Sequence, residues 1–66
     1  MLYIVINLAK IVLFASHDKT EAENFSANIP LTAVLIGTQR AIDNVTWPDT
    51  IPKEFLIQNG SGEDNP

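Results

Sequence analysis

His17 and Asp18 are the one place in the sequence where an imidazole and a carboxylate are adjacent. A carboxylate beside a histidine can orient the ring, which is what a general base needs. Adjacent side chains at the start of a helix usually point apart, however, and no nucleophile stands at a matching spacing. We therefore interpret His17 as a solvated residue at the entrance of a helix and expect no catalytic residues.

Metal and cofactor chemistry finds no support in the sequence. One histidine and no cysteine cannot supply the nitrogen and sulfur ligands of a structural zinc site. The eight carboxylates are scattered and match neither a calcium loop nor a paired acid–base arrangement. Glycines at positions 37, 60 and 62 form no phosphate-binding loop. We expect no metal, no cofactor and no enzymatic activity.

Trp47 and Pro48 are the strongest candidates for contact with another molecule. Tryptophan is enriched where interfaces concentrate their energy, and a loop stiffened by proline loses little entropy on binding. The predicted partner-binding residues are Trp47, Pro48, Asp49, Arg40 and Glu54. The alternative is that Trp47 folds back and covers the core, where a lone tryptophan commonly lies.

The balance of charge restricts the class of partner. Four basic against eight acidic residues give a net charge of −4. Phosphate backbones and anionic membrane surfaces are bound through Lys and Arg, so we expect neither as a direct partner. The charge is compatible with a basic partner protein and also keeps a small domain soluble.

Three Asn-x-Ser/Thr sequences begin at Asn24, Asn44 and Asn59. Each is a potential glycosylation acceptor, and together they would suit a secreted glycoprotein. Secreted domains of this size usually carry disulfides, whereas this chain has no cysteine. We treat the three acceptors as coincidental and expect a cytoplasmic protein.

The apolar segment at residues 2–15 admits three interpretations. Its runs Leu2–Ile6 and Ile11–Phe14 are rich in β-branched and aromatic residues, which favours two strands joined by a turn or bulge at Asn7–Lys10. The spacing of its polar residues would also fit one stripe of a helix. A targeting or membrane segment is the third possibility, although Lys10 interrupts it and it is short for a bilayer. We favour the strands.

Residues 18–28 carry the clearest helical pattern. Asp18 can cap the helix with Glu21 three positions later, and the spacing of Ala22, Phe25 and Ile29 gives one apolar face. Asn28 is expected to adopt the left-handed conformation that ends a helix, and Pro30 prevents its continuation.

The remaining segments complete a small sheet. Leu31–Ile36 is almost wholly apolar and ends at Gly37, which predicts a strand buried on both faces in the middle of the sheet. Residues 38–45 are expected to be a loop or a short helix, the helix having Ala41, Ile42 and Val45 turned inward. Residues 46–52 should be a loop, residues 54–58 a last strand, and residues 59–66 a flexible acidic tail.

These elements predict one α+β domain over residues 1–58, with a three- to four-stranded, mostly antiparallel sheet and one helix packed on one face. A chain of this length buries only about 60% of its surface, so a dimer through an exposed strand edge would be a natural reinforcement. We expect a non-catalytic module that inhibits or regulates another protein by occluding it, a type that includes small viral proteins. The alternatives are a membrane-associated protein with residues 2–15 in lipid, and a secreted glycoprotein.

Overall fold

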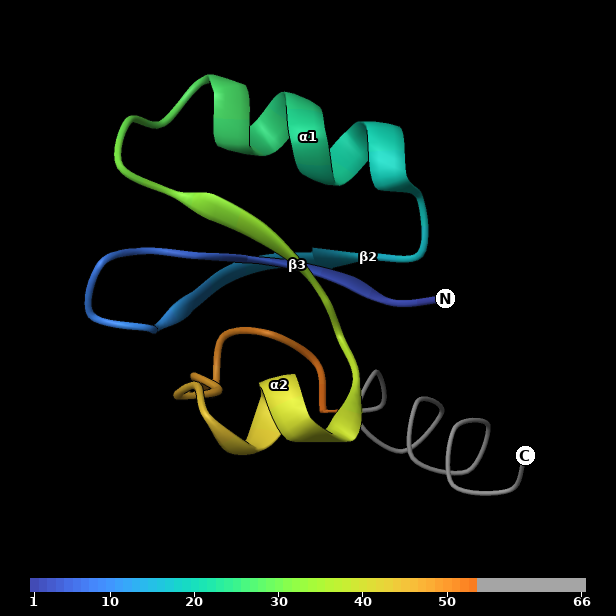
Figure 1. Cartoon of the computed structure of the whole chain (residues 1–66), viewed down its shortest axis with the longest axis vertical. Helices are drawn as coiled ribbons and strands as arrows, with labels where there is room; N and C mark the ends of the chain where they lie inside the picture. The colour runs from blue at the N-terminus through green and yellow to red at the C-terminus, as the bar shows by residue number, and fades with distance from the viewer. Residues whose placement is uncertain (54–66) are drawn as a thin grey trace.

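The computed structural model describes residues 1–53 of the 66-residue chain (Figure 1). This part contains, in order, the strands and helices β1 (Tyr3–Ile6), β2 (Val12–Ser16), α1 (Lys19–Ala27), β3 (Ala33–Ile36) and α2 (Gln39–Asp43). The strands form one antiparallel sheet in the order β2-β1-β3. The predicted α+β class is therefore confirmed, and residues 2–15 form a hairpin of strands. The strand expected at residues 54–58 and the tail at 59–66 lie outside the described residues.

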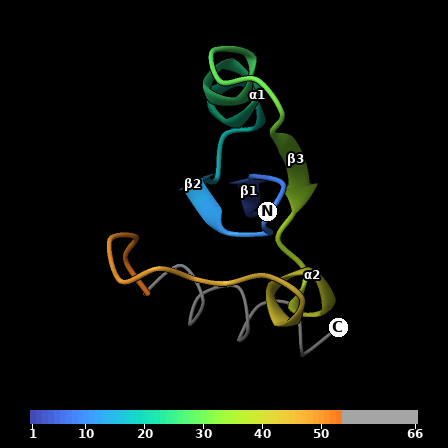
Figure 2. The same cartoon turned by 90° about the vertical axis from the view of Figure 1, so that its left-hand side faces the viewer.

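Both faces of the sheet are covered, which gives three layers (Figure 2). α1 lies on one face, where the rings of Phe14 and Phe25 stack with their centroids 4.5 Å apart. On the other face, α2 and residues 45–51 close over a cluster of buried apolar side chains. That cluster consists of Leu2, Ile4, Val12 and Ile51, with Ile6, Ala15, Leu35, Ile42, Val45 and Trp47 packed against it.

A β-bulge in β2 changes which face of the sheet its side chains point to. Val5 pairs with Phe14, but Ile6 pairs with Val12, so Leu13 is the extra residue. In a regular strand, Val12 and Phe14 would point to the same face, because side chains alternate with a period of two. The inserted residue changes this phase. As a result, Val12 is buried beneath the sheet while Phe14 reaches α1.

The start of α1 is fixed by side-chain hydrogen bonds. Asp18 Oδ1 accepts from the backbone N–H groups of Thr20 (2.9 Å) and Glu21 (3.4 Å), as an N-cap should. Glu21 does not return to the Asp18 backbone as a simple capping box would require. Instead, Ser16 Oγ donates to Glu21 Oε1 at 2.8 Å and accepts from the Asp18 N–H at 3.0 Å. The last residue of β2 therefore links the sheet to the cap.

The end of α1 differs from the prediction. Asn28 is not left-handed: its φ is −90° and its ψ is −4°. Its N–H bonds back to the carbonyls of the last turn, and its side-chain Nδ2 donates to the Asn24 carbonyl at 2.9 Å. The reversal is made three residues later, where Leu31 has a φ of 61°. Pro30 separates the two positions and prevents the helix from continuing.

The position of β3 also corrects the prediction. We expected the segment 31–36 to lie in the middle of the sheet, but the central strand is β1, and β3 is an edge strand of the described sheet. Ala33 is exposed and Ile36 is 49% exposed. Val34 and Leu35 are half-buried, and Leu35 packs against the core cluster. The prediction that this strand is buried on both faces is therefore wrong as well.

Gly37 is required by a close approach between β3 and β1. A Cβ at this position would lie 2.8 Å from Cδ2 and 2.9 Å from Cγ of Leu2, a side chain that is buried. We predict that Gly37→Ala lowers the free energy of unfolding by about 1–2 kcal/mol, because Leu2 has no free space to move into. A urea titration of the variant checks this value. An unchanged midpoint would contradict the packing of Leu2 against Gly37.

Candidate functional site

The β1–β2 turn holds an apolar side chain in solvent. Asn7 organises this turn: its Oδ1 accepts from the N–H groups of Ala9 (2.9 Å) and Ile11 (3.0 Å), and its carbonyl accepts from the Lys10 N–H at 2.9 Å. Lys10 closes the turn in the left-handed conformation, with a φ of 62°. The tip of the turn is Leu8, which is 77% exposed. The hydrogen bonds of Asn7 therefore fix an apolar residue where a turn ordinarily carries a polar one.

The loop between α1 and β3 also holds an apolar side chain in solvent, that of Leu31. Thr32 fastens this loop, because its Oγ1 lies 2.6 Å from Ser26 Oγ and donates to the carbonyls of Ser26 (3.2 Å) and Ile29 (2.8 Å). Leu31 is left-handed and 72% exposed. A non-glycine residue in this conformation costs about 1–2 kcal/mol, yet the side chain gains almost no burial in return. Backbone strain of this kind is concentrated at functional positions.

The two loops meet at one end of the molecule, at the left of Figure 1. Two hollows of about 390 and 320 Å³ lie there, and both are lined by Asn7, Leu8, Leu31 and Thr32. Ala9, Leu13, Ile29 and Pro30 complete the larger hollow, and Ile6, Lys10 and Ala33 complete the smaller. We call this surface the Leu8/Leu31 patch. An apolar surface held in place by two structured loops is typical of a contact with another macromolecule.

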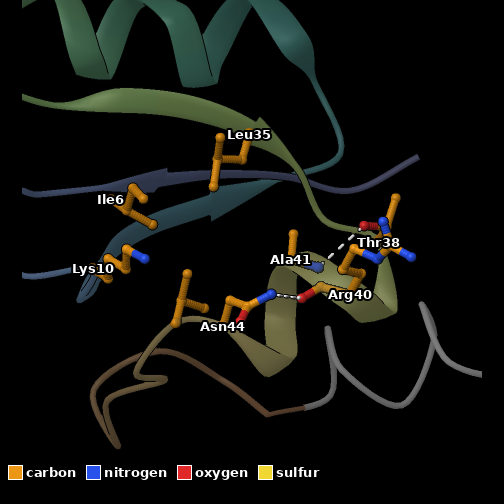
Figure 3. Close-up of a pocket in the computed structure, with 8 residues that line it drawn as sticks. Ile6, Lys10, Leu35, Thr38, Arg40, Ala41 and Asn44 are labelled. Atoms are coloured by element: carbon orange, nitrogen blue, oxygen red, sulfur yellow. Dashed lines mark hydrogen bonds between the residues drawn. The ribbon is translucent and has the colours of Figure 1, made fainter.

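A third hollow, of about 280 Å³, lies between the sheet and α2 (Figure 3). Ile6 and Leu35 line it from the sheet, and Ala41 and Asn44 line it from α2 and its C-cap. Val45 is also among its lining residues. Lys10 and Arg40 stand at its opposite ends. Ile6 and Lys10 also line the smaller hollow of the Leu8/Leu31 patch, so the surface is continuous from one to the other.

The charge around these three hollows is of one sign. Lys10 and Arg40 are the charged residues among the lining side chains, and no carboxylate of residues 1–53 lines any of the three. The ion pairs found within that range lie elsewhere, Lys19 with Glu23 at 4.0 Å and Lys53 with Asp49 at 3.5 Å. Although the whole chain is acidic, this surface is apolar and locally basic.

The residues predicted to bind a partner are not brought together. Arg40 lies at the hollow beneath the sheet, whereas Trp47 is half-buried against the core cluster and donates from Nε1 to the Ile51 carbonyl at 3.2 Å. Pro48 is half-buried, and exposed Asp49 pairs with Lys53. Glu54 lies outside the described residues. Of the four predicted residues that the structure describes, only Arg40 lines one of the three hollows.

Leu8 and Leu31 were missed in the sequence, although one signal was available for Leu8. The predicted turn at residues 7–10 already contained it, and a leucine at a turn tip is expected to be exposed. Leu31 carried no such signal, since it opens an apolar run that reads as strand. In the structure, β3 begins two residues later, at Ala33, and the left-handed backbone of Leu31 turns its side chain outward.

His17 and Asp18 both contact backbone groups of the fold. His17 is exposed, and its Nδ1 lies 3.3 Å from the Met1 carbonyl, while Asp18 caps α1. Within residues 1–53, no three His, Cys, Asp or Glu side chains gather as metal ligands would. None of the helices in the same range has the length and apolar character needed to cross a membrane.

Comparison of the chain with protein-family models, curated proteins and solved structures gave no match.

Proposed function

We propose that this chain is a protein-binding module that acts by contact and occlusion rather than by catalysis, and that the Leu8/Leu31 patch is its binding surface. The observation that carries the proposal is the conformation of Leu31. The left-handed backbone of Leu31 lowers the stability of the fold, and a side chain that is 72% exposed regains little of it by burial. Such strain is expected where a partner contacts the side chain. The exposure of Leu8 beside the same hollows supports the same surface.

Replacing Leu31 separates binding from stability. Asparagine tolerates the left-handed conformation better than leucine, so we predict that Leu31→Asn raises the free energy of unfolding by about 0.5–1 kcal/mol. The same substitution removes an exposed apolar contact, so it should abolish or strongly weaken the retention of a partner. A loss of binding in a protein that is more stable cannot be ascribed to unfolding.

The measurement is affinity capture with the immobilised full chain, followed by quantification of each retained protein and a urea titration of each variant. A retained protein is accepted as a partner only if the Leu31→Asn and Leu8→Asn variants no longer retain it. The matched control is Ile36→Thr, which removes an exposed apolar side chain on β3, outside the patch. Equal retention by wild type and Leu31→Asn, or the absence of any stoichiometric partner, would contradict the proposal.

Self-association is tested on the same samples by sedimentation. A dimer formed by the wild type and dissolved by Leu31→Asn would identify the partner as a second copy of this chain. A dimer that persists in Leu31→Asn would place self-association at another surface, such as the outer edge of β3.

A further inference from the structure

The hollow between the sheet and α2 differs from the other two because both cations stand at it. We propose that it receives an acidic residue of the partner protein together with a neighbouring apolar side chain. This inference rests on the proposed function, since it names the chemistry that a partner presents beside the Leu8/Leu31 patch.

The walls of the hollow favour apolar side chains. Its volume of about 280 Å³ is at the lower end of the range usual for small-molecule sites, about 300–1,000 Å³. The walls are mainly Ile6, Leu35, Ala41 and Val45. An apolar side chain of a bound polypeptide would occupy part of this space and displace water from those walls.

The polar groups of the hollow favour an anion. Thr38 Oγ1 already accepts from the Ala41 N–H at 3.2 Å, and Asn44 Nδ2 already donates to the Arg40 carbonyl at 2.8 Å (Figure 3). The ammonium of Lys10 and the guanidinium of Arg40 form no ion pair within residues 1–53. Each of these groups, at its own end of the hollow, is therefore available to a carboxylate, which a guanidinium can bind through two parallel hydrogen bonds.

The local charge also revises the expected partner. A net charge of −4 is compatible with a basic protein, as the sequence suggested. The hollow beneath the sheet, however, is lined by Lys10 and Arg40 and by no carboxylate of the described residues. Screening in physiological salt limits the reach of charges to about 8 Å, which reduces the effect of the acidic residues of α1 on the other face of the sheet. Asp43 of α2 does not line the hollow, and its carboxylate accepts from Gln39 Nε2 at 2.9 Å. The partner should carry acidic groups where it meets this surface.

The test uses two capped tripeptides as probes, acetyl-Leu-Glu-Leu-amide and its glutamine counterpart, titrated into the isotope-labelled full chain and followed by NMR. The glutamate peptide should give saturable shifts at Ile6, Leu35, Ala41 and Val45. The glutamine peptide should bind about two- to five-fold more weakly, as should the glutamate peptide with Lys10→Gln or Arg40→Gln, since exposed ion pairs contribute modestly. Added salt should reduce the difference.

Lys19→Gln is the matched control, because it removes the same charge from α1 on the opposite face of the sheet. It should leave the affinity unchanged. Equal affinity for the two peptides, shifts at other residues, or no saturable shift up to about 10 mM peptide would each overturn the inference. Loss of capture by Leu31→Asn with equal binding of the two peptides would leave the proposed function standing while removing this one. Capture that Leu31→Asn retains would remove the proposed function, and with it this inference about the partner, even if the glutamate peptide bound more tightly than the glutamine peptide.

Discussion

Ile4→Ala should remove much of the stability of this protein. Ile4 has no exposed surface and lies in the central strand, within the cluster that also holds Leu2, Val12 and Ile51. Truncating a fully buried isoleucine loses the transfer free energy of its methyl and methylene groups and leaves a cavity, which together cost about 2–5 kcal/mol. A 66-residue domain has only about 3–10 kcal/mol in all, so we expect the variant to be partly unfolded at 25 °C.

The fluorescence of Trp47, the single tryptophan, provides the measurement, since its side chain packs against the same cluster. Urea midpoints would be compared for wild type, Ile4→Ala and Ile4→Val, the last of which should cost about 0.5–1.5 kcal/mol. The control is Ile36→Ala, because Ile36 is 49% exposed. If Ile4→Ala were no more harmful than Ile36→Ala, the assignment of β1 as the central strand would be wrong.

Trp47→Ala should destabilise the fold by about 2 kcal/mol. A fully buried tryptophan costs about 3–5 kcal/mol on truncation, and Trp47 is half-buried, so the lower figure follows. The substitution also removes the hydrogen bond from Nε1 to the Ile51 carbonyl and uncovers Ile51, which belongs to the core. Trp47→Phe should keep most of the packing and lose about 1 kcal/mol.

This prediction separates the two interpretations of Trp47. If the side chain covers the core, Trp47→Ala shifts the unfolding midpoint measured by circular dichroism. If it is the principal contact for a partner, binding falls and the midpoint stays. Asp49→Ala in the same loop is the control, because its pair with Lys53 is exposed and should contribute little. An unchanged midpoint for Trp47→Ala would contradict the packing role and favour Trp47 as a binding residue.

Most features fixed by neighbouring residues were predicted correctly, although the left-handed conformation expected at Asn28 was wrong. The cap of α1 depends on Asp18 and the residues directly after it, and the short helix at α2 depends on Thr38, whose Oγ1 accepts from the Ala41 N–H. The turn at residues 7–10 is likewise local, because Asn7 bonds to the N–H groups of Ala9 and Ile11. In each case the group that decides the structure lies within four residues of its partner.

Features fixed by distant parts of the chain were predicted poorly. The apolar run 31–36 predicts a strand, but its burial and its place in the sheet depend on which run pairs with two others. Likewise, the parallel bridge between Ile11 and Thr46, with Val12 N–H donating to the Thr46 carbonyl at 3.0 Å, joins segments that no local pattern connects. The hollow beneath the sheet arises from this long-range closure, so of its two cations only Arg40 was suspected.

The order of strands has a consequence for biosynthesis. β1 pairs with β3 as well as with β2, and Leu2 shares a core with Ile51. Contacts between segments so distant along the chain form slowly, since the intervening loop must be ordered first. While the ribosome is still adding residues 33–51, the aliphatic side chains of β1 are not yet fully buried. The core can close only when residues 33–51 have left the exit tunnel, and an apolar strand that stays exposed until then is prone to aggregation.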